Sequence, residues 1–170
     1  MKLLGILPYT PTPIRTRPYY LLQALIQRGH EVTLATLWES DAERTALAAL
    51  EAQGVRLVTE RLSKVQALLN MASAFAQGRP LQSGYSWHPS LARRVELLLR
   101  SEEFAAVHVE HLRGAAYARL AQRVLAERGR ARCLVWDSVD CISLLFEQAA
   151  QGSRSFFGRW VTRLELPRTR

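Results

Sequence analysis

Long uninterrupted apolar runs are absent from this sequence of 170 residues, and cysteine is nearly absent. No stretch approaches the roughly 20 consecutive apolar residues that a membrane-spanning helix needs, and Pro8 comes too early for a signal peptide. Cys133 and Cys141 are too few for a disulfide framework and lack the C-x-x-C spacing of a metal or redox site. These absences predict a cytoplasmic protein, and the length is that of a single domain.

Glycine is missing from the loop after the first apolar segment, residues 8–18. The dinucleotide fingerprint G-x-G-x-x-G and the P-loop both require glycines, because their backbones must approach phosphate closely. We therefore expect no nicotinamide or ATP site and no other cofactor. Arg15 and Arg17 begin the helical pattern that follows, where guanidinium groups and exposed N–H groups can meet an anion. Simple solvation is the alternative for Arg15.

Acidic residues are in the minority, with 15 Asp and Glu against 23 Lys and Arg and a formal net charge of +8. An excess of positive charge favours an anionic partner such as phosphate, nucleic acid or an acidic lipid surface. The arginines are spread along the chain, whereas nucleic-acid binders usually gather basic residues in one stripe with aromatic residues between them. We therefore expect no nucleic-acid partner.

Apolar segments of two kinds alternate along the chain. Short, almost continuously apolar segments predict strands buried on both faces, at residues 2–7, 31–36, 55–59, 105–110 and 132–136. Segments whose apolar residues recur three or four apart predict helices, at about 17–28, 41–53, 62–77, 90–101, 112–128, 140–150 and 155–165. This alternation predicts an α/β fold, a Rossmann-like doubly wound parallel sheet with helices on both faces.

Residues at the ends of the predicted helices agree with this assignment. Gly29 and Gly54 follow the first two helices, where a residue of positive φ often ends a helix. Asp41 and Ser90 stand where a side-chain oxygen can cap a first helical turn. Residues 78–89 show neither pattern and are predicted to form an irregular loop.

The predicted topology places three strand ends side by side. Right-handed crossovers give the strand order 3-2-1-4-5, and in such sheets ligands bind beyond the carboxyl ends of the strands, where the order reverses. The ends of the first, fourth and fifth strands carry Tyr9-Thr10, Glu110-His111 and Asp137-Ser138-Val139-Asp140. We therefore expect a polar site at this edge, with solvation of the loops as the alternative for any single residue.

Two histidines lie in or next to the fourth predicted strand, and they are expected to have different roles. His111 follows a strand and precedes a helix, so its imidazole can donate a hydrogen bond to a phosphate or to an acceptor hydroxyl. His108 lies within the strand and is interpreted as a core histidine with a hydrogen-bond partner. Alternation along the strand turns His111 away from the face shared by His108 and Glu110, so no metal site is expected.

Two aspartates three residues apart follow the fifth strand. Of Asp137 and Asp140, one can cap the next helix, which we expect of Asp140, while the other can accept a proton or bind a hydroxyl. Ser138 does not lie in a G-x-S-x-G elbow, so no nucleophilic serine is expected.

Three segments together resemble a known family. A proline-rich loop and Arg17 precede a helix that ends in Arg28-Gly29-His30-Glu31-Val32, the fourth strand ends in Val109-Glu110-His111, and the fifth leads into Asp137-Ser138-Val139-Asp140-Cys141-Ile142-Ser143. On these segments the sequence resembles the group 1 retaining glycosyltransferases of the GT-B fold, in particular sugar transferases of exopolysaccharide and exosortase-associated clusters. The resemblance covers essentially the whole chain, although many relatives carry glycine where this chain has Ile14-Arg15-Thr16.

The resemblance implies a function for the complete enzyme and a role for this part of it. The enzyme would transfer a sugar from a nucleotide-sugar donor to a polysaccharide or lipid-linked acceptor, with retention and without a metal. Residues 1–152 would form the Rossmann-like N-terminal acceptor-binding domain. Residues 153–170 would form a helix leading toward a donor-binding domain that the chain lacks, so the chain alone would be inactive.

The resemblance also implies the site residues. Asp137 and His111 would be the catalytic residues, in contact with the acceptor hydroxyl or phosphate. The residues that would bind the acceptor or its phosphate are Arg17, Glu110, Tyr9 and Asp140.

A non-catalytic binding module of the flavodoxin-like or response-regulator-like kind is the alternative, because it would share the same sheet. A response regulator would carry an acidic pair at the end of the first strand. This chain has Leu7-Pro8-Tyr9 at that point.

The segment from residue 61 to residue 77 combines an apolar face with basic flanks. Arg61, Lys64 and Arg79 flank apolar residues at helical spacing, namely Leu62, Val65, Leu68, Leu69, Met71, Ala72, Phe75 and Ala76. Such a helix can lie in the lipid headgroup layer, as an enzyme with a lipid-linked acceptor requires, and would make the protein peripheral at the inner membrane face. Packing of this face on the sheet, as in any crossover helix, is the alternative.

Overall fold

A computed structural model of the chain describes residues 1–138. Its elements are β1 (Lys2–Leu7), α1 (Thr16–Gln27), β2 (Glu31–Trp38), α2 (Asp41–Glu51), β3 (Arg56–Arg61), α3 (Lys64–Ala76), α4 (Leu81–Tyr85), α5 (Pro89–Ser101), β4 (Ala106–Glu110), η1 (Leu112–Gly114), α6 (Ala115–Glu127), η2 (Ala131–Cys133) and β5 (Leu134–Asp137). The helices predicted at 140–150 and 155–165, and the domain boundary predicted at 152, lie outside the described residues.

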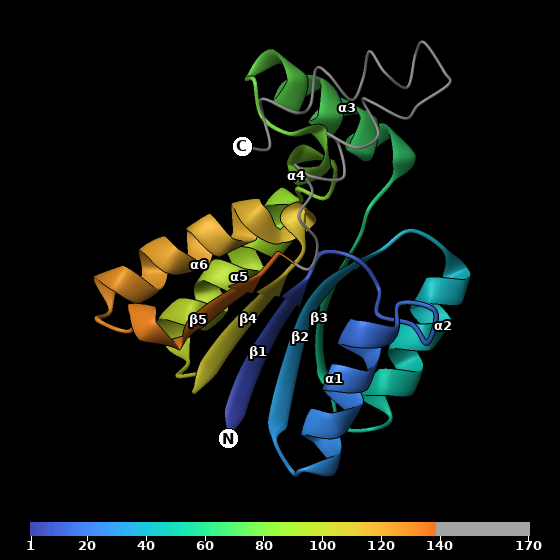
Figure 1. Ribbon diagram of the computed structural model, residues 1–170. Helices are drawn as coiled ribbons and strands as arrows, with labels where there is room; N and C mark the ends of the chain where they lie inside the picture. Colours follow the sequence, from blue (N-terminus) through green and yellow to red (C-terminus); the bar gives the residue numbers. More distant parts are fainter. Residues whose placement is uncertain (139–170) are drawn as a thin grey trace, which may run out of the picture.

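The strands form one parallel sheet in the order β3-β2-β1-β4-β5, as the crossover rule predicts. Helices α1 and α2 lie on one face of the sheet, and α5 and α6 lie on the other (Figure 1). The fold is therefore α/β, with a Rossmann-like doubly wound sheet. The strand order reverses between β1 and β4, which pair directly with each other.

The hydrophobic core consists of one layer on each face of the sheet. Leu4 and Ile6 of β1 pack in the layer formed with α5 and α6, whereas Leu7 packs in the layer formed with α1 and α2. Because both faces are covered, residues of both orientations are apolar, and six consecutive residues of β2, Val32 to Leu37, are buried. This double burial explains why the strands are almost continuously apolar in sequence.

Helix ends and helix contacts depend on glycine at defined positions. Gly29 and Gly54 have φ values of 73° and 96°, as predicted for residues that follow helices. The loop predicted at residues 78–89 contains the short helix α4, which packs closely on α3. At Gly84 an added Cβ would lie 2.5 Å from the Cβ of Ala74, so only glycine permits this approach.

Two predicted helix caps are wrong by one or two residues. The cap of α2 is Ser40 rather than Asp41, because the Ser40 hydroxyl accepts a hydrogen bond from the N–H of Glu43. Helix α5 begins at Pro89, so Ser90 lies inside its first turn. Proline suits the first helical position because the N–H that it lacks would have no partner there.

Helix α3 lies with α4 beyond the carboxyl ends of the strands (Figure 1). The buried residues of α3 are Ala67 and Ala74. Val65, Leu68 and Leu69 are 69%, 64% and 60% exposed, so the alternative that the apolar face packs on the sheet is wrong for these three side chains. No helix within residues 1–138 has the length and apolar character needed to cross a bilayer.

Candidate functional site

The residues predicted at the carboxyl edge, the side of the sheet where β1, β4 and β5 end, lie close together. Glu110 is the register partner of Asp137. The N–H of His111 donates to the carbonyl of Asp137 over 2.7 Å, and the rings of Tyr9 and His111 meet edge to face with centroids 6.1 Å apart. The structure thus brings four predicted site residues together. Asp140 lies outside the described residues.

Arg17, at the start of α1, forms an ion pair with Asp137, the last residue of β5. The Nε2 atom of His108 lies 3.9 Å from the same carboxylate. The Arg17 side chain is 55% exposed and that of Asp137 is 25% exposed, so the pair contributes at most about 1 kcal/mol to stability. Its effect is geometric, because it fixes the direction of the Asp137 carboxylate. The sequence placed Arg17 at the site without indicating this partner.

His108 is half-buried, so its predicted place in the core is wrong, whereas the partner expected for it is present as Asp137. Burial lowers the pKa of His108 from its ordinary value of 6.5, and the charge of Asp137 opposes this shift. The imidazole is therefore neutral at pH 7. One of its ring nitrogens can accept a hydrogen bond.

Among the side chains that the structure describes, Glu110 is the one buried Asp, Glu, Lys, Arg or His, and 2% of its surface is exposed. Its Oε2 atom has no hydrogen-bond partner among residues 1–138. Burial raises the pKa of Glu110 above 4.5, and the charge of Arg17 opposes the rise. Burial also raises the pKa of the Tyr9 phenol, and the negative charge of Glu110 adds to this effect. The protonated Tyr9 hydroxyl also shares a hydrogen bond with the Glu110 carboxyl group.

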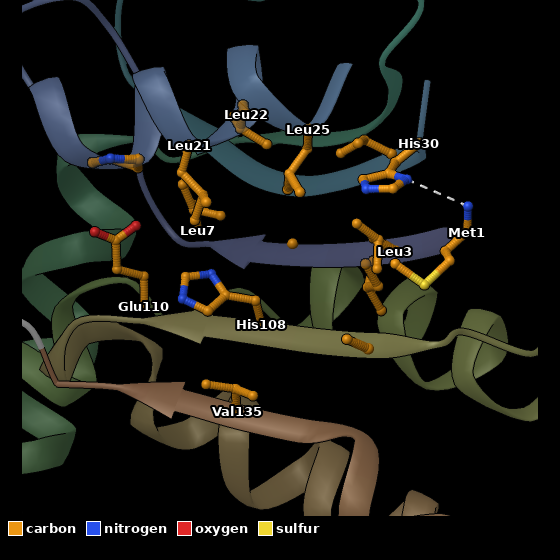
Figure 2. A pocket seen from close by; sticks show the side chains of 15 residues that line it. Met1, Leu3, Leu7, Leu21, Leu22, Leu25, His30, His108, Glu110 and Val135 are labelled. Atoms are coloured by element: carbon orange, nitrogen blue, oxygen red, sulfur yellow. Dashed lines mark hydrogen bonds between the residues drawn. The ribbon is translucent and has the colours of Figure 1, made fainter. Parts of the chain in front are cut away.

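An apolar cavity of about 290 Å³ lies between α1 and the sheet, with Glu110 and His108 at its polar end (Figure 2). Leu3 and Leu21 are among the side chains around it. Val135 of β5 also lines the cavity and is 52% exposed. Glu110 thus lies between an apolar hollow and the polar edge, which explains why its ionised form is disfavoured.

His111 has a backbone conformation that residues with side chains rarely adopt, with φ 67° and ψ 161°. Its Nδ1 atom accepts a hydrogen bond from the N–H of Arg113 over 3.2 Å, so the neutral ring carries its proton on Nε2. The Trp136 indole donates to the His111 carbonyl over 3.3 Å. Strain of this kind persists where surrounding contacts enforce it, and it is concentrated at functional sites.

A separate polar cavity of about 320 Å³ is lined by Tyr9, Arg15, Gln82, His111 and Arg113. His111 therefore faces away from the cavity that His108 and Glu110 line, as strand alternation predicts. No pattern in the sequence indicated Gln82 or Arg113. Both lie in short local elements, α4 and η1, which are too brief to produce a periodic pattern.

Neither metal geometry nor similarity to known proteins identifies the site. Within residues 1–138, no group of three or more His, Cys, Asp or Glu side chains is placed to hold a metal ion. A scan against protein-family models gave no match, and searches of curated proteins and of solved structures gave none either. We therefore infer the function from the family resemblance of the sequence and from the geometry and chemistry of the carboxyl edge.

Substituting His111 tests whether its backbone is strained. His111→Gly and His111→Ala both lose the imidazole. The difference between their free energies of unfolding therefore measures the cost of the positive φ at residue 111. We expect the glycine variant to be the more stable by about 1–3 kcal/mol. Urea denaturation measures the free energy of unfolding of each variant.

Gln122, exposed on α6, provides the matched control. Gln122→Gly should be less stable than Gln122→Ala by about 1 kcal/mol, the ordinary cost of glycine in a helix. If the glycine variant is also the less stable one at residue 111, the backbone of His111 is not strained.

Substituting Glu110 tests its buried charge. The raised pKa means that the folded state binds this proton more tightly than the unfolded chain. Above the folded-state pKa the ionised carboxylate lowers stability, and this penalty disappears as pH falls below the ordinary value of 4.5. We expect Glu110→Gln to raise the free energy of unfolding at pH 7 by about 1 kcal/mol or more.

Urea denaturation from about pH 4 to pH 8 checks this dependence. Glu51→Gln, an exposed change at the end of α2, is the control and should show no such gain. A Glu110→Gln effect of equal size at every pH, or a loss of stability at neutral pH, would contradict a buried charge.

Proposed function

We propose that this chain is the N-terminal, acceptor-binding half of a retaining glycosyltransferase of the GT-B architecture. In the complete enzyme a sugar moves from a nucleotide-sugar donor to a hydroxyl of a polysaccharide or lipid-linked acceptor. The donor pocket belongs to a second domain outside these residues. Support comes from the family resemblance of three sequence segments and from the chemistry of the carboxyl edge.

The observation that carries the proposal is the buried carboxylate at the reversal of strand order. Glu110 is 2% exposed, and its Oε2 atom lacks a partner within the described chain. A buried acceptor atom without a partner costs free energy, so a ligand hydroxyl that donates to it is favoured. Acceptor sugars present several hydroxyl donors, and this edge of a doubly wound sheet is where ligands bind.

Each neighbouring side chain has a role in the proposed site. Asp137 accepts a hydrogen bond from the reacting hydroxyl, and Arg17 holds the Asp137 carboxylate in position. In the adjoining polar cavity, the Nε2–H of His111 can donate to a further acceptor oxygen or to a phosphate, and the Tyr9 ring lies beside it. Glu110 binds a second acceptor hydroxyl and thereby orients the ring.

The variant Asp137→Asn tests this arrangement in the transferase that contains both halves. We expect kcat to fall about a hundredfold, because an amide cannot replace the oriented carboxylate in the transition state. Stability should fall by less than about 1 kcal/mol, since the pair with Arg17 is partly exposed. Steady-state kinetics and urea denaturation measure the two effects.

Asp41→Asn, an exposed change at the start of α2, is the matched control and should leave kcat unchanged. An unchanged kcat in Asp137→Asn together with a large loss of stability would assign Asp137 to a structural role instead.

We also propose that α3 contacts the membrane surface when a lipid-linked acceptor is bound. Val65, Leu68 and Leu69 expose a continuous apolar face, and Lys64 stands at its start. A helix with this pattern gains free energy from apolar burial in the headgroup layer and from attraction to anionic lipid. The protein would then be peripheral at the inner membrane face.

Co-sedimentation with vesicles of increasing anionic lipid content tests this contact. We expect binding to increase with anionic content, and Lys64→Glu combined with Leu69→Ser to reduce the bound fraction at least about fivefold. Leu97→Ser is the control, because Leu97 on α5 is also 60% exposed. No binding to acidic vesicles at low salt, or equal loss in the control, would remove the membrane proposal.

A further inference from the structure

The polar cavity beside His111 contains two arginines and no carboxylate in its wall. Its lining residues are Tyr9, Arg15, Gln82, His111 and Arg113. Among residues 1–138, Arg113 forms no ion pair, and Arg15 has a single long one, with 3.8 Å between its Nη2 and the Oε1 of Glu43. Two guanidinium groups therefore give the cavity an excess of positive charge, which favours an anionic ligand.

Aromatic rings hold both guanidinium groups in place. The Arg15 guanidinium lies 4.8 Å from the ring centroid of Tyr9, and that of Arg113 lies 4.9 Å from that of Tyr85. Stacking fixes the plane of an arginine without using its N–H donors. The Nη1 of Arg15 also donates to the carbonyl of Thr10 over 2.9 Å, which holds this guanidinium further and leaves its other donors for a ligand. These donors are thus preorganised for paired contacts to the oxygens of a phosphoryl group, and less entropy is lost when it binds.

Two further groups in the wall suit a phosphoryl ligand. The Tyr9 phenol is protonated at neutral pH, and its hydroxyl shares a hydrogen bond with Glu110, which holds the ring in the wall of the cavity. The side-chain amide of Gln82 has a buried Oε1 atom without a hydrogen-bond partner within the described chain. Rotation of this amide by half a turn presents its NH₂ group to a ligand instead.

The cavity adjoins α4, which packs against the helix that exposes apolar side chains. One wall comes from α4, through Gln82, and α4 packs against α3. Helix α3 also carries the exposed apolar side chains Val65, Leu68 and Leu69. A phosphoryl group attached to an apolar chain can therefore occupy the cavity while its chain stays near α3.

We infer that this cavity binds the phosphoryl group of a phosphate-bearing acceptor, with Arg15 and Arg113 as its principal ligands. The inference rests on the proposed function in assigning the phosphoryl group to the acceptor rather than to another molecule. The ligand chemistry is a phosphate monoester or diphosphate, either soluble or carried by a lipid.

Isothermal titration calorimetry of the whole chain with inorganic phosphate and with decyl phosphate tests the cavity. At physiological ionic strength we expect saturable binding of at least one probe, and a loss of affinity of about tenfold or more in Arg113→Gln. Arg113→Lys should recover part of the affinity, because it keeps the charge and loses the planar fork. If decyl phosphate binds more tightly than inorganic phosphate, the ligand is a phosphate carried by a lipid. If the two probes bind equally, the ligand is a soluble phosphate.

Arg28→Gln is the matched control, because it removes one positive charge at the far end of α1. It should change the affinity less than about twofold. Circular dichroism checks that each variant is folded, and Arg15→Gln replaces Arg113→Gln if the latter is unfolded. No saturable binding of either probe, or an equal loss in Arg28→Gln, overturns the inference.

The outcomes separate this inference from the proposed function. If phosphate binding fails while Asp137→Asn still slows the transferase, the cavity assignment alone is wrong. If phosphate binds with the expected dependence on Arg113 while Asp137→Asn leaves turnover unchanged, the transferase proposal is wrong and the phosphoryl cavity stands.

Discussion

The reversal of strand order between β1 and β4 is the constraint on which the site depends. All five strands are parallel, so they end at one edge, and right-handed crossovers direct the chain after β1 to one face and the chain after β4 to the other. The two loops therefore leave the sheet toward opposite faces at this point. Tyr9, Glu110 and Asp137 lie at this edge because each follows or ends one of the three strands that meet there.

Two features of this edge oppose folding. Glu110 is a buried carboxylate with an unpartnered oxygen, and His111 has a backbone conformation that favours glycine. Each costs on the order of 1–3 kcal/mol, a substantial part of the roughly 5–15 kcal/mol that stabilises a typical domain. Neighbouring residues that both reduce stability are better explained by ligand binding than by packing. The two preorganised arginines beside His111 indicate that part of this ligand is anionic.

The strands and their order were predictable because burial on both faces leaves a continuous apolar pattern and chirality permits one crossover hand. The ion pair of Arg17 with Asp137 was not predictable, since it depends on where α1 begins in space. Helix α4 has five residues, too few for a periodic signal. Periodicity identified the apolar face of α3 but could not show whether the sheet covers it. The strain at His111 was not predictable either, because alternation along a strand indicates the face on which a side chain lies but not the backbone angle φ.

The central claim is a division of labour, in which this chain recognises the acceptor and a second domain binds the donor. Calorimetric titration of the chain with UDP-, GDP- and TDP-sugars tests it most directly. We predict no saturable binding of any of these nucleotide sugars, because the loop after β1, residues 8–18, lacks the glycines that let a backbone approach a diphosphate. Tight, saturable binding of a nucleotide sugar to the chain alone would contradict the claim.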